Sequence, residues 1–322
     1  MNILVTGGLG FVGFNLARDL ARSGGCAVIA ADLHDPTPEQ EAVLQAAGPV
    51  RCARLDVRDR QAYARLVETG HITHIVHAAA VTPSDQMERE QAPLVTEINL
   101  NGALNALTIG YEQPGVERVL LVSSSGVYGF PPADPFSPQR EEGPLALNNL
   151  YAVTKHAAEL VAARYAALSG KPMAAVRLGS VYGPFEHPGK SRQQVSQVQR
   201  MANALREGRR MRLYGPDVAR DWVYTADISA AVRALLSAPR WNYPVYNIGS
   251  PVPVSFSEVA AAFQQLGLQV EWVTDPASAD LAMLDASRRA PLSLERLQAD
   301  TGFTPRFTFA AALQDYLAPK QS

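Results

Sequence analysis

The sequence TGGLGFVG, residues 6–13, follows the first apolar run of the chain, Asn2–Thr6. That run is rich in β-branched residues and predicts a strand, whereas the apolar spacing of Phe11–Ser23 predicts a helix. The glycines allow a sharp turn, a close backbone approach to a pyrophosphate, and tight packing of the helix on the strand. The start of the helix would point its N–H groups and positive dipole end at that phosphate. This order predicts a dinucleotide-binding turn made by Gly7, Gly10, Phe11, Val12 and Gly13.

Short apolar runs and amphipathic segments alternate beyond this turn. Further strands are predicted at Ala27–Leu33, Arg51–Leu55, Thr73–Ala78, Val116–Val122 and Pro172–Val176, and helices at Asp59–Glu68, Ala92–Tyr111 and Leu150–Ser169. Continuous apolar strands between helices are typical of a parallel sheet that is covered on both faces. We therefore expect an α/β fold with a doubly wound parallel sheet of the Rossmann type.

The pattern changes in the second half of the chain. Residues 129–149 are rich in proline, which predicts a long loop, and loops of this length are often functional. Shorter helices are predicted at Val198–Glu207, Asp227–Ser237, Ser255–Gln265 and Phe309–Leu317. We expect a dinucleotide-binding domain of the Rossmann type over residues 1–178 and a smaller C-terminal α/β substrate-binding region over residues 179–322, with some exchange of chain between the two.

The composition excludes several classes of protein. Of 322 residues, 29 are basic and 31 are acidic, so the chain has no basic excess to neutralise the phosphates of a nucleic acid. No uncharged apolar run is long enough for a membrane span. The first five residues already predict a strand, so no signal peptide is expected, and two cysteines are too few for a disulfide framework. We expect a cytoplasmic protein that binds neither nucleic acid nor membrane.

An acidic residue closes the second predicted strand. Asp32 follows the glycine turn at the distance where a carboxylate accepts hydrogen bonds from both hydroxyls of a ribose. The carboxylate would repel a 2′-phosphate, and no arginine stands directly beside it, so NAD is favoured over NADP. Leu33 follows Asp32 in the predicted cofactor site, and Asp56 and Val57, after the third strand, are predicted to meet the adenine.

Tyr151 and Lys155 lie at the start of the helix predicted over Leu150–Ser169. Positions i and i+4 share a helix face, so the phenol and the ammonium point the same way. The cation stabilises a phenolate and lowers the tyrosine pKa, which makes Tyr151 a candidate general acid and base. Ser123-Ser124-Ser125 ends the fifth predicted strand, at the edge where open α/β sheets bind ligands.

Together these motifs resemble those of the extended short-chain dehydrogenase/reductase superfamily, in its NAD-dependent sugar-nucleotide epimerase/dehydratase family. The resemblance spans nearly the whole chain. It rests on TGGLGFVG at 6–13, HAAA at 77–80, EINLNG at 97–102, SSSGVYG at 123–129, Tyr151 with Lys155, RLGSVYGP at 177–184, RDWVY at 220–224 and NIGS at 247–250. These motifs imply the fold and NAD as the cofactor, and they leave the substrate open.

The resemblance implies roles for individual residues. Lys155 would bind the nicotinamide ribose, Ser124 would hydrogen-bond the substrate oxygen that becomes a carbonyl, and Tyr151 would remove the hydroxyl proton. Arg220 would hold a substrate phosphate. Further cofactor contacts are implied for Ala78, Ala79, Ala80, Asn99 and Val122, and further substrate contacts for Thr82, Ser125 and Ser180. Two such chains would form a homodimer through the helices near 92–111 and 150–169.

The chain departs from the family pattern at three places. Dehydratases of the family carry an acidic pair where this chain has Ser125 and Gly126, so a dehydratase is disfavoured. Ser180 replaces an asparagine that commonly touches substrate. A second phosphate-binding arginine is usual where this chain has Pro276-Ala277-Ser278, and one such contact is worth about 1.5–3 kcal/mol. Its substitutes in this chain are Arg192, Arg288 or Arg289.

Three functions are compatible with the sequence. We favour an NAD-dependent epimerase of a nucleotide sugar, which oxidises a ring carbon transiently to a keto intermediate. The alternative is an NAD-dependent dehydrogenase or reductase of a sugar or sugar acid, because fewer phosphate contacts suit a smaller substrate. A third is a non-catalytic NAD-sensing regulator, which would not need Tyr151 and Lys155. No metal site is expected at His71, His74 and His77, because successive side chains of a strand switch faces.

Overall fold

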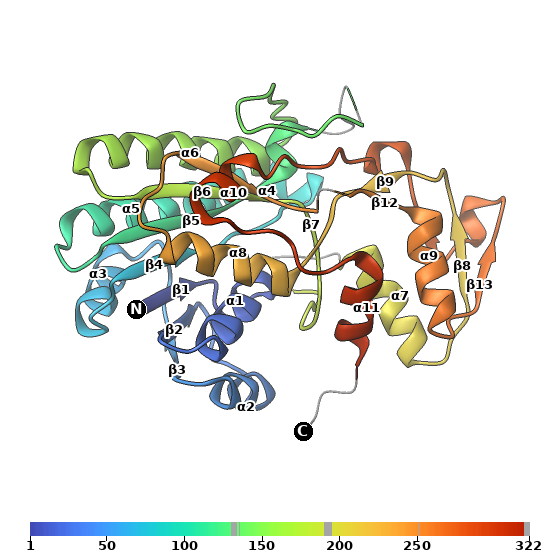
Figure 1. Cartoon of the computed structure of the whole chain (residues 1–322), viewed down its shortest axis with the longest axis horizontal. Helices are drawn as coiled ribbons and strands as arrows, with labels where there is room; N and C mark the ends of the chain where they lie inside the picture. The colour runs from blue at the N-terminus through green and yellow to red at the C-terminus, as the bar shows by residue number, and fades with distance from the viewer. Residues whose placement is uncertain (130–133, 135, 190–194, 251, 319–322) are drawn as a thin grey trace.

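The computed structural model describes residues 1–129, 134, 136–189, 195–250 and 252–318. Within them a seven-stranded sheet has the order β11-β6-β5-β4-β1-β2-β3 (Figure 1). Its strands are β1 (Asn2–Thr6), β2 (Ala27–Asp32), β3 (Val50–Arg54), β4 (His74–His77), β5 (Arg118–Ser124), β6 (Met173–Leu178) and β11 (Val245–Ile248). Every neighbouring pair is parallel, which confirms the predicted doubly wound sheet. The strand order reverses between β1 and β4, where such folds bind ligands.

Helices cover both faces of this sheet. One face packs against α1 (Phe11–Arg22), α2 (Pro38–Ala47) and α8 (Thr225–Ser237), and the other against α3 (Arg60–Thr69), α5 (Gly102–Glu112) and α6 (Leu150–Ser169). Side chains of β1 alternate between the two layers, with Ile3 and Val5 on the first face and Leu4 on the second. Burial on both faces explains why these strands are continuous apolar runs.

A second, smaller α/β region lies to one side of the sheet (right in Figure 1). It contains α7 (Gln197–Arg206), α9 (Phe256–Gln265) and α11 (Phe309–Leu317), with the parallel strands β8 (Met211–Tyr214), β13 (Val270–Trp272) and β14 (Leu281–Ala282). Two short pairs connect it to the sheet: β7 (Ser180–Tyr182) with β10 (Trp222–Tyr224), and β9 (Ala219–Arg220) with β12 (Val254–Ser255). Met201, Leu213 and Phe263 lie in its separate core.

The second half of the chain also completes the main sheet. Strand β11 pairs with β6, and α8 packs against α1 over the sheet face. Helix α10 (Glu295–Thr301) then packs on α8 and β11. The sheet is therefore built from segments on both sides of residue 178, and the predicted division into two domains stays a prediction. The assignment of residues 179–322 to substrate binding remains a prediction.

The segment Ala92–Tyr111 is helical throughout, as predicted, but it is not one regular α-helix. Helix α4 (Asp85–Thr96) begins earlier, after Ser84 accepts a hydrogen bond from Met87 N, and has a non-helical residue at Gln91. A π-helical turn, Glu97–Asn101, separates α4 from α5. Pro93 inside α4 lacks an N–H donor, which accounts for a break in the hydrogen-bond ladder close to Gln91. In the described residues no helix has the length and apolarity needed to cross a membrane.

Candidate active site

The glycine turn joins β1 to α1 at the carboxyl edge of the sheet. Gly7 has φ +65°, in the left-handed region that favours glycine. A Cβ on Gly13 would lie 2.1 Å from the carbonyl oxygen of Gly7, and a Cβ on Gly7 would lie 2.8 Å from Ala79 Cα. Helix α1 begins directly after Gly10, which carries no side chain to cap it. This tight backbone cradle at a helix start fits the pyrophosphate of NAD.

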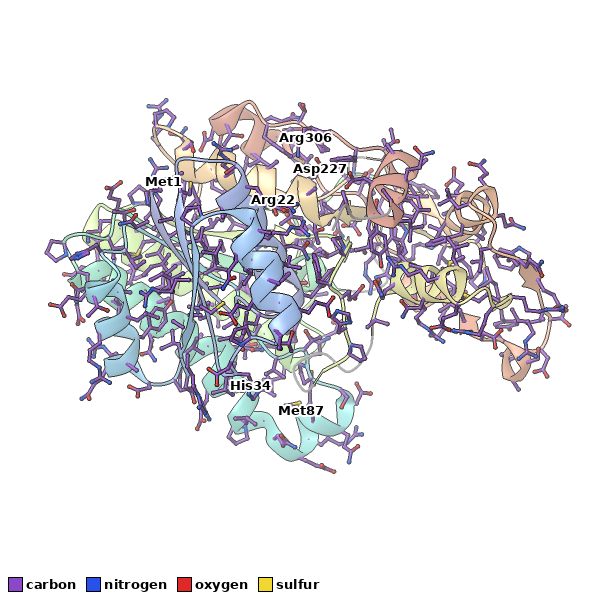
Figure 2. The ribbon with its side chains drawn as sticks, turned by 90° about the horizontal axis from the view of Figure 1, so that it is seen from below. Met1, Arg22, His34, Met87, Asp227 and Arg306 are labelled. Carbon is purple, nitrogen blue, oxygen red and sulfur yellow. The ribbon has the colours of Figure 1, made fainter. Side chains whose placement is uncertain are left out.

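Asp32 lies at the end of β2, beside the same turn. Its Oδ2 accepts a hydrogen bond from Leu9 N at 3.1 Å, and its Oδ1 accepts one from Leu33 N at 2.8 Å. Gln40 of α2 donates to Leu9 O at 3.1 Å, a contact that the sequence analysis missed. Figure 2 shows His34, just after β2, and Met87 of α4 at one end of the domain, with Met1 and Arg22 at the other. Asp32 thus lies at the edge predicted for the cofactor.

Asp56 follows β3 and is held by an arginine. Arg58 donates Nε to Oδ1 of Asp56 at 3.0 Å and Nη2 to Oδ2 at 2.6 Å. This hydrogen bonding lowers the pKa of Asp56, so the carboxylate stays charged. Its neighbour Val57 is buried and would contact a Cβ on Gly102 at 2.8 Å. The adenine contact by Asp56 and Val57 stays a prediction. The observed partner of the Asp56 carboxylate is Arg58.

The residues after β4 lie against the glycine turn. Ala78 N donates to Thr6 O at 3.1 Å, and the Ala79 backbone lies next to Gly7. Buried Asn99 holds the backbone at Val81, just after Ala78–Ala80. Its Nδ2 donates to Val81 O at 2.9 Å, and its Oδ1 accepts from Val81 N at 2.8 Å. The observed contacts of Asn99 are therefore structural. Ala80 and exposed Thr82 lie on either side of Val81.

Lys155 is a buried ammonium next to the Tyr151 ring. Its Nζ donates to Val122 O at 2.8 Å and lies 5.7 Å from the centroid of the Tyr151 ring. Burial lowers the pKa of Lys155 to about 8, against the opposing effect of Glu159. The predicted pairing of phenol and ammonium on one face of α6 is therefore present in the structure. Val122, for which a cofactor contact is predicted, positions Lys155 through its carbonyl oxygen.

The start of α6 is fixed by two acceptors. Asn149 Oδ1 accepts from Ala152 N at 2.8 Å, and Glu88 of α4 accepts from Leu150 N at 2.9 Å. Ser124 ends β5, and its Oγ accepts from Gly126 N at 3.0 Å in the short turn that packs against α6. Its neighbour Ser125 is buried. These contacts hold Tyr151 at the first turn of α6, on the side of the helix packed by the β5 end.

A buried ion pair holds α6, the helix of Tyr151 and Lys155, against the sheet. Glu159 is 2% exposed and accepts hydrogen bonds from Arg177 Nη2 at 2.7 Å and Arg177 Nε at 3.0 Å. Ser123 Oγ donates to it at 2.5 Å, and His156 Nδ1 lies 3.1 Å away. The RLGSVYGP motif is recognisable in the sequence, but this role of its arginine was not predicted. Because the pair ties α6 to β5 and β6, it holds the helix of Lys155 on the strand that carries Ser124.

A polar cluster lies where the second region meets the sheet. Arg220 donates Nε to Ser180 Oγ at 3.3 Å and Nη1 to Gln197 Oε1 at 3.2 Å, and its guanidinium lies 4.9 Å over the Trp222 ring. Ser180 Oγ donates to Asp221 Oδ1 at 2.9 Å. Burial raises the pKa of Asp221 to about 6, against the hydrogen bond from Ser180 and the charge of Arg220. The structure thus joins two predicted substrate residues, Ser180 and Arg220.

One of the three arginines proposed as substitutes lies in this cluster. Arg289 N donates to Ala219 O at 3.2 Å, and burial together with repulsion from Arg220 lowers the pKa of its guanidinium. Asp221 opposes that shift. Arg288 instead forms a 3.8 Å ion pair with Asp285, and Arg192 lies outside the described residues. Arg289 is therefore the candidate that the structure brings next to Arg220.

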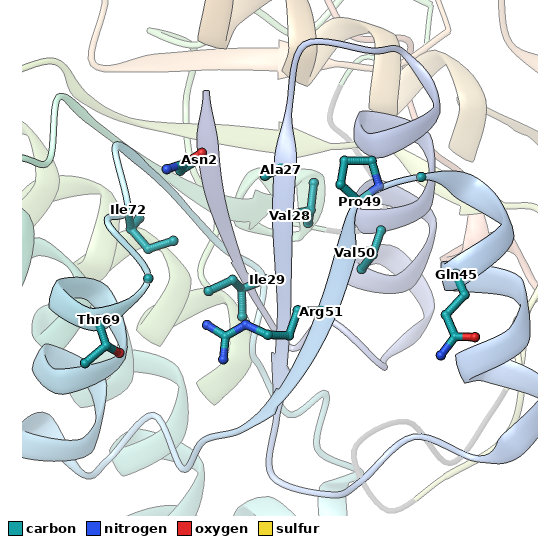
Figure 3. Close-up of a pocket in the computed structure, with 12 residues that line it drawn as sticks. Asn2, Ala27, Val28, Ile29, Gln45, Pro49, Val50, Arg51, Thr69 and Ile72 are labelled. Carbon is teal, nitrogen blue, oxygen red and sulfur yellow. The ribbon is translucent and has the colours of Figure 1, made fainter.

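A hollow of about 710 Å³ lies at the opposite end of the sheet (Figure 3). Its walls include Ala27, Val28, Val50 and Arg51, at the amino ends of β2 and β3. Open α/β sheets bind ligands beyond the carboxyl ends of their strands. We therefore place the reaction at the carboxyl edge, where the glycine turn, Ser124 and Tyr151 lie, and not in this hollow.

Comparisons with known proteins identify the family of this chain. Residues 3–249 match the NAD dependent epimerase/dehydratase family. A dTDP-glucose 4,6-dehydratase of Streptomyces griseus is 28% identical over 97% of this chain and 92% of its own, and a probable UDP-glucuronate 4-epimerase of Rhizobium meliloti is 29% identical over 74% and 69%. The structure of a UDP-glucose 4-epimerase of Thermus thermophilus with NAD is 29% identical, with TM-score 0.76 and 98% of each chain covered.

The fold and the site define an NAD-dependent enzyme of the extended short-chain dehydrogenase/reductase type. The chain belongs to the NAD dependent epimerase/dehydratase family, as the sequence resemblance implied. Its cofactor is NAD, which fits the backbone cradle at Gly7–Gly13. The two relatives named above, a dTDP-glucose 4,6-dehydratase and a probable UDP-glucuronate 4-epimerase, carry the names of sugar-nucleotide enzymes.

Proposed function

We propose that this protein is an epimerase of a nucleotide sugar that works by transient oxidation of one ring carbon to a ketone. The observation that carries this proposal is the residue set at the end of β5. Ser124, Tyr151 and Lys155 are present, and the Tyr151 phenol is the group for proton transfer. The two positions after Ser124, where a dehydratase needs an acidic pair, hold Ser125 and Gly126. Elimination of water requires a positioned acid and base, and neither the Ser125 hydroxyl nor Gly126 can supply them.

Each catalytic side chain has one task in this scheme. The Lys155 ammonium stabilises the phenolate form of Tyr151, which takes the proton of the substrate hydroxyl and becomes a neutral phenol. Ser124 donates a hydrogen bond to the oxygen that becomes the carbonyl. NAD, when bound, supplies the hydride acceptor and donor. Return of the hydride to the opposite face of the same carbon, together with return of the proton from Tyr151 to the oxygen, would complete a cycle with no net oxidation.

The arginine cluster supports a substrate that carries a diphosphate. Arg220 donates to Ser180 Oγ, and Arg289 lies close enough to Arg220 and Asp221 for their charges to shift its pKa. Charge-assisted contacts from arginine are the usual recognition of phosphate groups. Arg289 thereby compensates for the arginine that is missing at Pro276-Ala277-Ser278. This weakens the argument for a smaller, unphosphorylated sugar acid as substrate.

Turnover without accumulation of NADH tests the proposal. The NAD-loaded protein is incubated with UDP- and dTDP-linked hexoses and hexuronic acids, and products are followed by proton NMR and the NADH absorbance. An epimer formed with flat absorbance supports the proposal. NADH that accumulates in step with product would instead identify a dehydrogenase. Unchanged behaviour of Tyr151→Phe in every assay would favour an NAD-sensing regulator.

An apolar strip on the outer helices supports a homodimer. Val153, Leu160 and Leu168 of α6 and Tyr111 of α5 are exposed, although the opposite side of α6 is buried in the core. Helices α5 and α6 pack against each other, so the strip runs across a two-helix surface. A second copy of the same surface would bury it in a four-helix arrangement. We include this homodimer in the proposed function.

A further inference from the structure

A small cavity is lined by Lys155, the residue that carries the proposed catalytic ammonium. Its polar walls are His77, Asn99, Ser123, Lys155 and Glu159, and the rest of its lining is apolar. The cavity measures about 10 Å³, which is close to the lower limit for one water. It lies among the strands β4 and β5 and the helices α5 and α6, apart from the glycine turn that receives the cofactor.

Two of these five polar groups already have hydrogen-bond partners in the protein. Asn99 uses its amide on Val81, and Glu159 receives hydrogen bonds from Arg177 and Ser123. Within the described residues, Lys155 Nζ makes one hydrogen bond, to Val122 O, although an ammonium has three donors. One further donor would serve the ribose implied by the family resemblance. A donor of the buried ammonium therefore remains for a partner on the cavity side.

His77 supplies the matching unpartnered atom. The side chain is 2% exposed, and its Nδ1 lies 2.9 Å from Thr6 Oγ1. Its Nε2 is buried and has no hydrogen-bond partner among the described residues. Burial, reinforced by the Lys155 charge, lowers the pKa of His77 to about 3, so the ring is neutral at working pH. A neutral ring with Nδ1–H donating to Thr6 has an acceptor lone pair at Nε2.

We propose that one ordered water occupies this cavity, accepts a hydrogen bond from Lys155 Nζ and donates one to His77 Nε2, so that His77 positions the catalytic ammonium. The water's second hydrogen can be donated to Ser123 Oγ, which gives three partners, the usual number for a buried water. A buried polar atom without a partner is costly, and this water satisfies both His77 and Lys155.

This water also sets the charge of Lys155. Solvation of the ammonium favours its protonated form, against the burial that favours the neutral amine. The other groups that face Lys155 are Glu159 on its own helix, Arg177 of β6 and His156 through Glu159, and the Tyr151 phenol. Loss of the water therefore lowers the Lys155 pKa while leaving the Glu159–Arg177 pair in place.

The first test is a crystal structure of the unmodified protein at about 1.5 Å or better. We expect an ordered water within about 2.7–3.2 Å of both Lys155 Nζ and His77 Nε2. A cavity without density for water would overturn the proposal. This arm is independent of the proposed function, because it needs neither substrate nor turnover.

The second test compares His77→Leu with His74→Leu. Both histidines are buried on β4, but His74 bonds Thr73 and does not line the cavity, so it is the matched control. We expect the fall of kcat at high pH to begin about one pH unit lower in His77→Leu, which gives about tenfold lower kcat at pH 9. His74→Leu keeps the original profile. Equal profiles for the two variants would overturn the proposal.

The kinetic test rests on the proposed function. Failure of the proposed function and failure of the water bridge can be distinguished by a measurement that needs no turnover. If the protein turns over no nucleotide sugar, the Lys155 pKa is measured by NMR of the ¹³C-labelled lysine side chain in the original protein and both variants. A pKa lowered only in His77→Leu supports the water bridge. A pKa that is the same in all three proteins contradicts it.

Discussion

Lys155 illustrates how burial would set the pH range in which a proposed catalytic group works. Its pKa is lowered to about 8 by desolvation, and Glu159 opposes that shift. The ammonium is the form that stabilises the Tyr151 phenolate. As pH rises through about 8, Lys155 loses its proton, and this stabilisation is lost with it.

We therefore expect kcat to fall as pH rises above about 8, by roughly tenfold per unit once Lys155 is deprotonated. The measurement is kcat from pH 6 to 10 with saturating substrate, with circular dichroism to check that the fold persists at each pH. A rate that stays level to pH 10 would show that the charge of Lys155 does not matter.

Arg289 offers a test of phosphate recognition with a natural control beside it. Arg289 lies next to Arg220, whereas Arg288 pairs with Asp285. Loss of one charge-assisted contact of about 1.5–3 kcal/mol raises KM about 10- to 150-fold. We expect that increase for Arg289→Ala and a change below threefold for Arg288→Ala, measured by initial-rate kinetics. Equal KM values for the two variants would remove Arg289 from the substrate site.

The candidate site was only partly predictable from single residues. Local motifs revealed the glycine triplet, Asp32 and the Tyr151–Lys155 pair, because each of them acts within one turn or one helix face. Gln40, Glu88 and Arg177 were missed because each contacts the site across a long separation in sequence. The choice of Arg289 over Arg288 likewise depends on which neighbouring side chain turns inward, which no local pattern reports.

The β1–α1 turn depends on the absence of a side chain at Gly13. An added Cβ would lie 2.1 Å from Gly7 O, and the conflict is with backbone that cannot move away. We expect Gly13→Ala to lower stability by about 1–3 kcal/mol and to weaken NAD binding at least tenfold.

Calorimetric titration with NAD and thermal unfolding measure these two effects. Gly115→Ala is the control, because a Cβ there has no heavy atom within 4 Å. Should Gly13→Ala bind NAD like Gly115→Ala, the assignment of this turn to the pyrophosphate fails.

Among the elements, periodicity predicted α6 and α11 with the bounds that the structure has. It missed α2, whose Thr37–Gln40 capping box is a local signal that could have been found. The break at Gln91 and the π-turn at Glu97–Asn101 were not predictable from apolar spacing. Pro93 lies next to the break, and Asn99 of the π-turn bonds Val81, a residue 18 positions away in the sequence. The pairing of β11 with β6 joins segments some 70 residues apart, which no local pattern determines.

For the whole molecule, the exposed strip on α5 and α6 predicts a dimer. Leu160 is 60% exposed at its centre, so a charge there would oppose burial against a second copy without disturbing the core. We expect Leu160→Glu to be monomeric in size-exclusion chromatography with light scattering, and Leu284→Glu, with an equally exposed leucine elsewhere, to keep the original mass. An original protein that is itself monomeric at micromolar concentration would contradict the dimer.

The most direct test of the account is epimerisation in D₂O. If a hydride leaves one ring carbon and returns to the same carbon, the product carries no deuterium there and no NADH accumulates. We predict this outcome by proton NMR and absorbance, with a loss of rate of about 10²–10⁴-fold in Tyr151→Phe. Deuterium at the inverted carbon would show proton abstraction from carbon and would contradict transient oxidation.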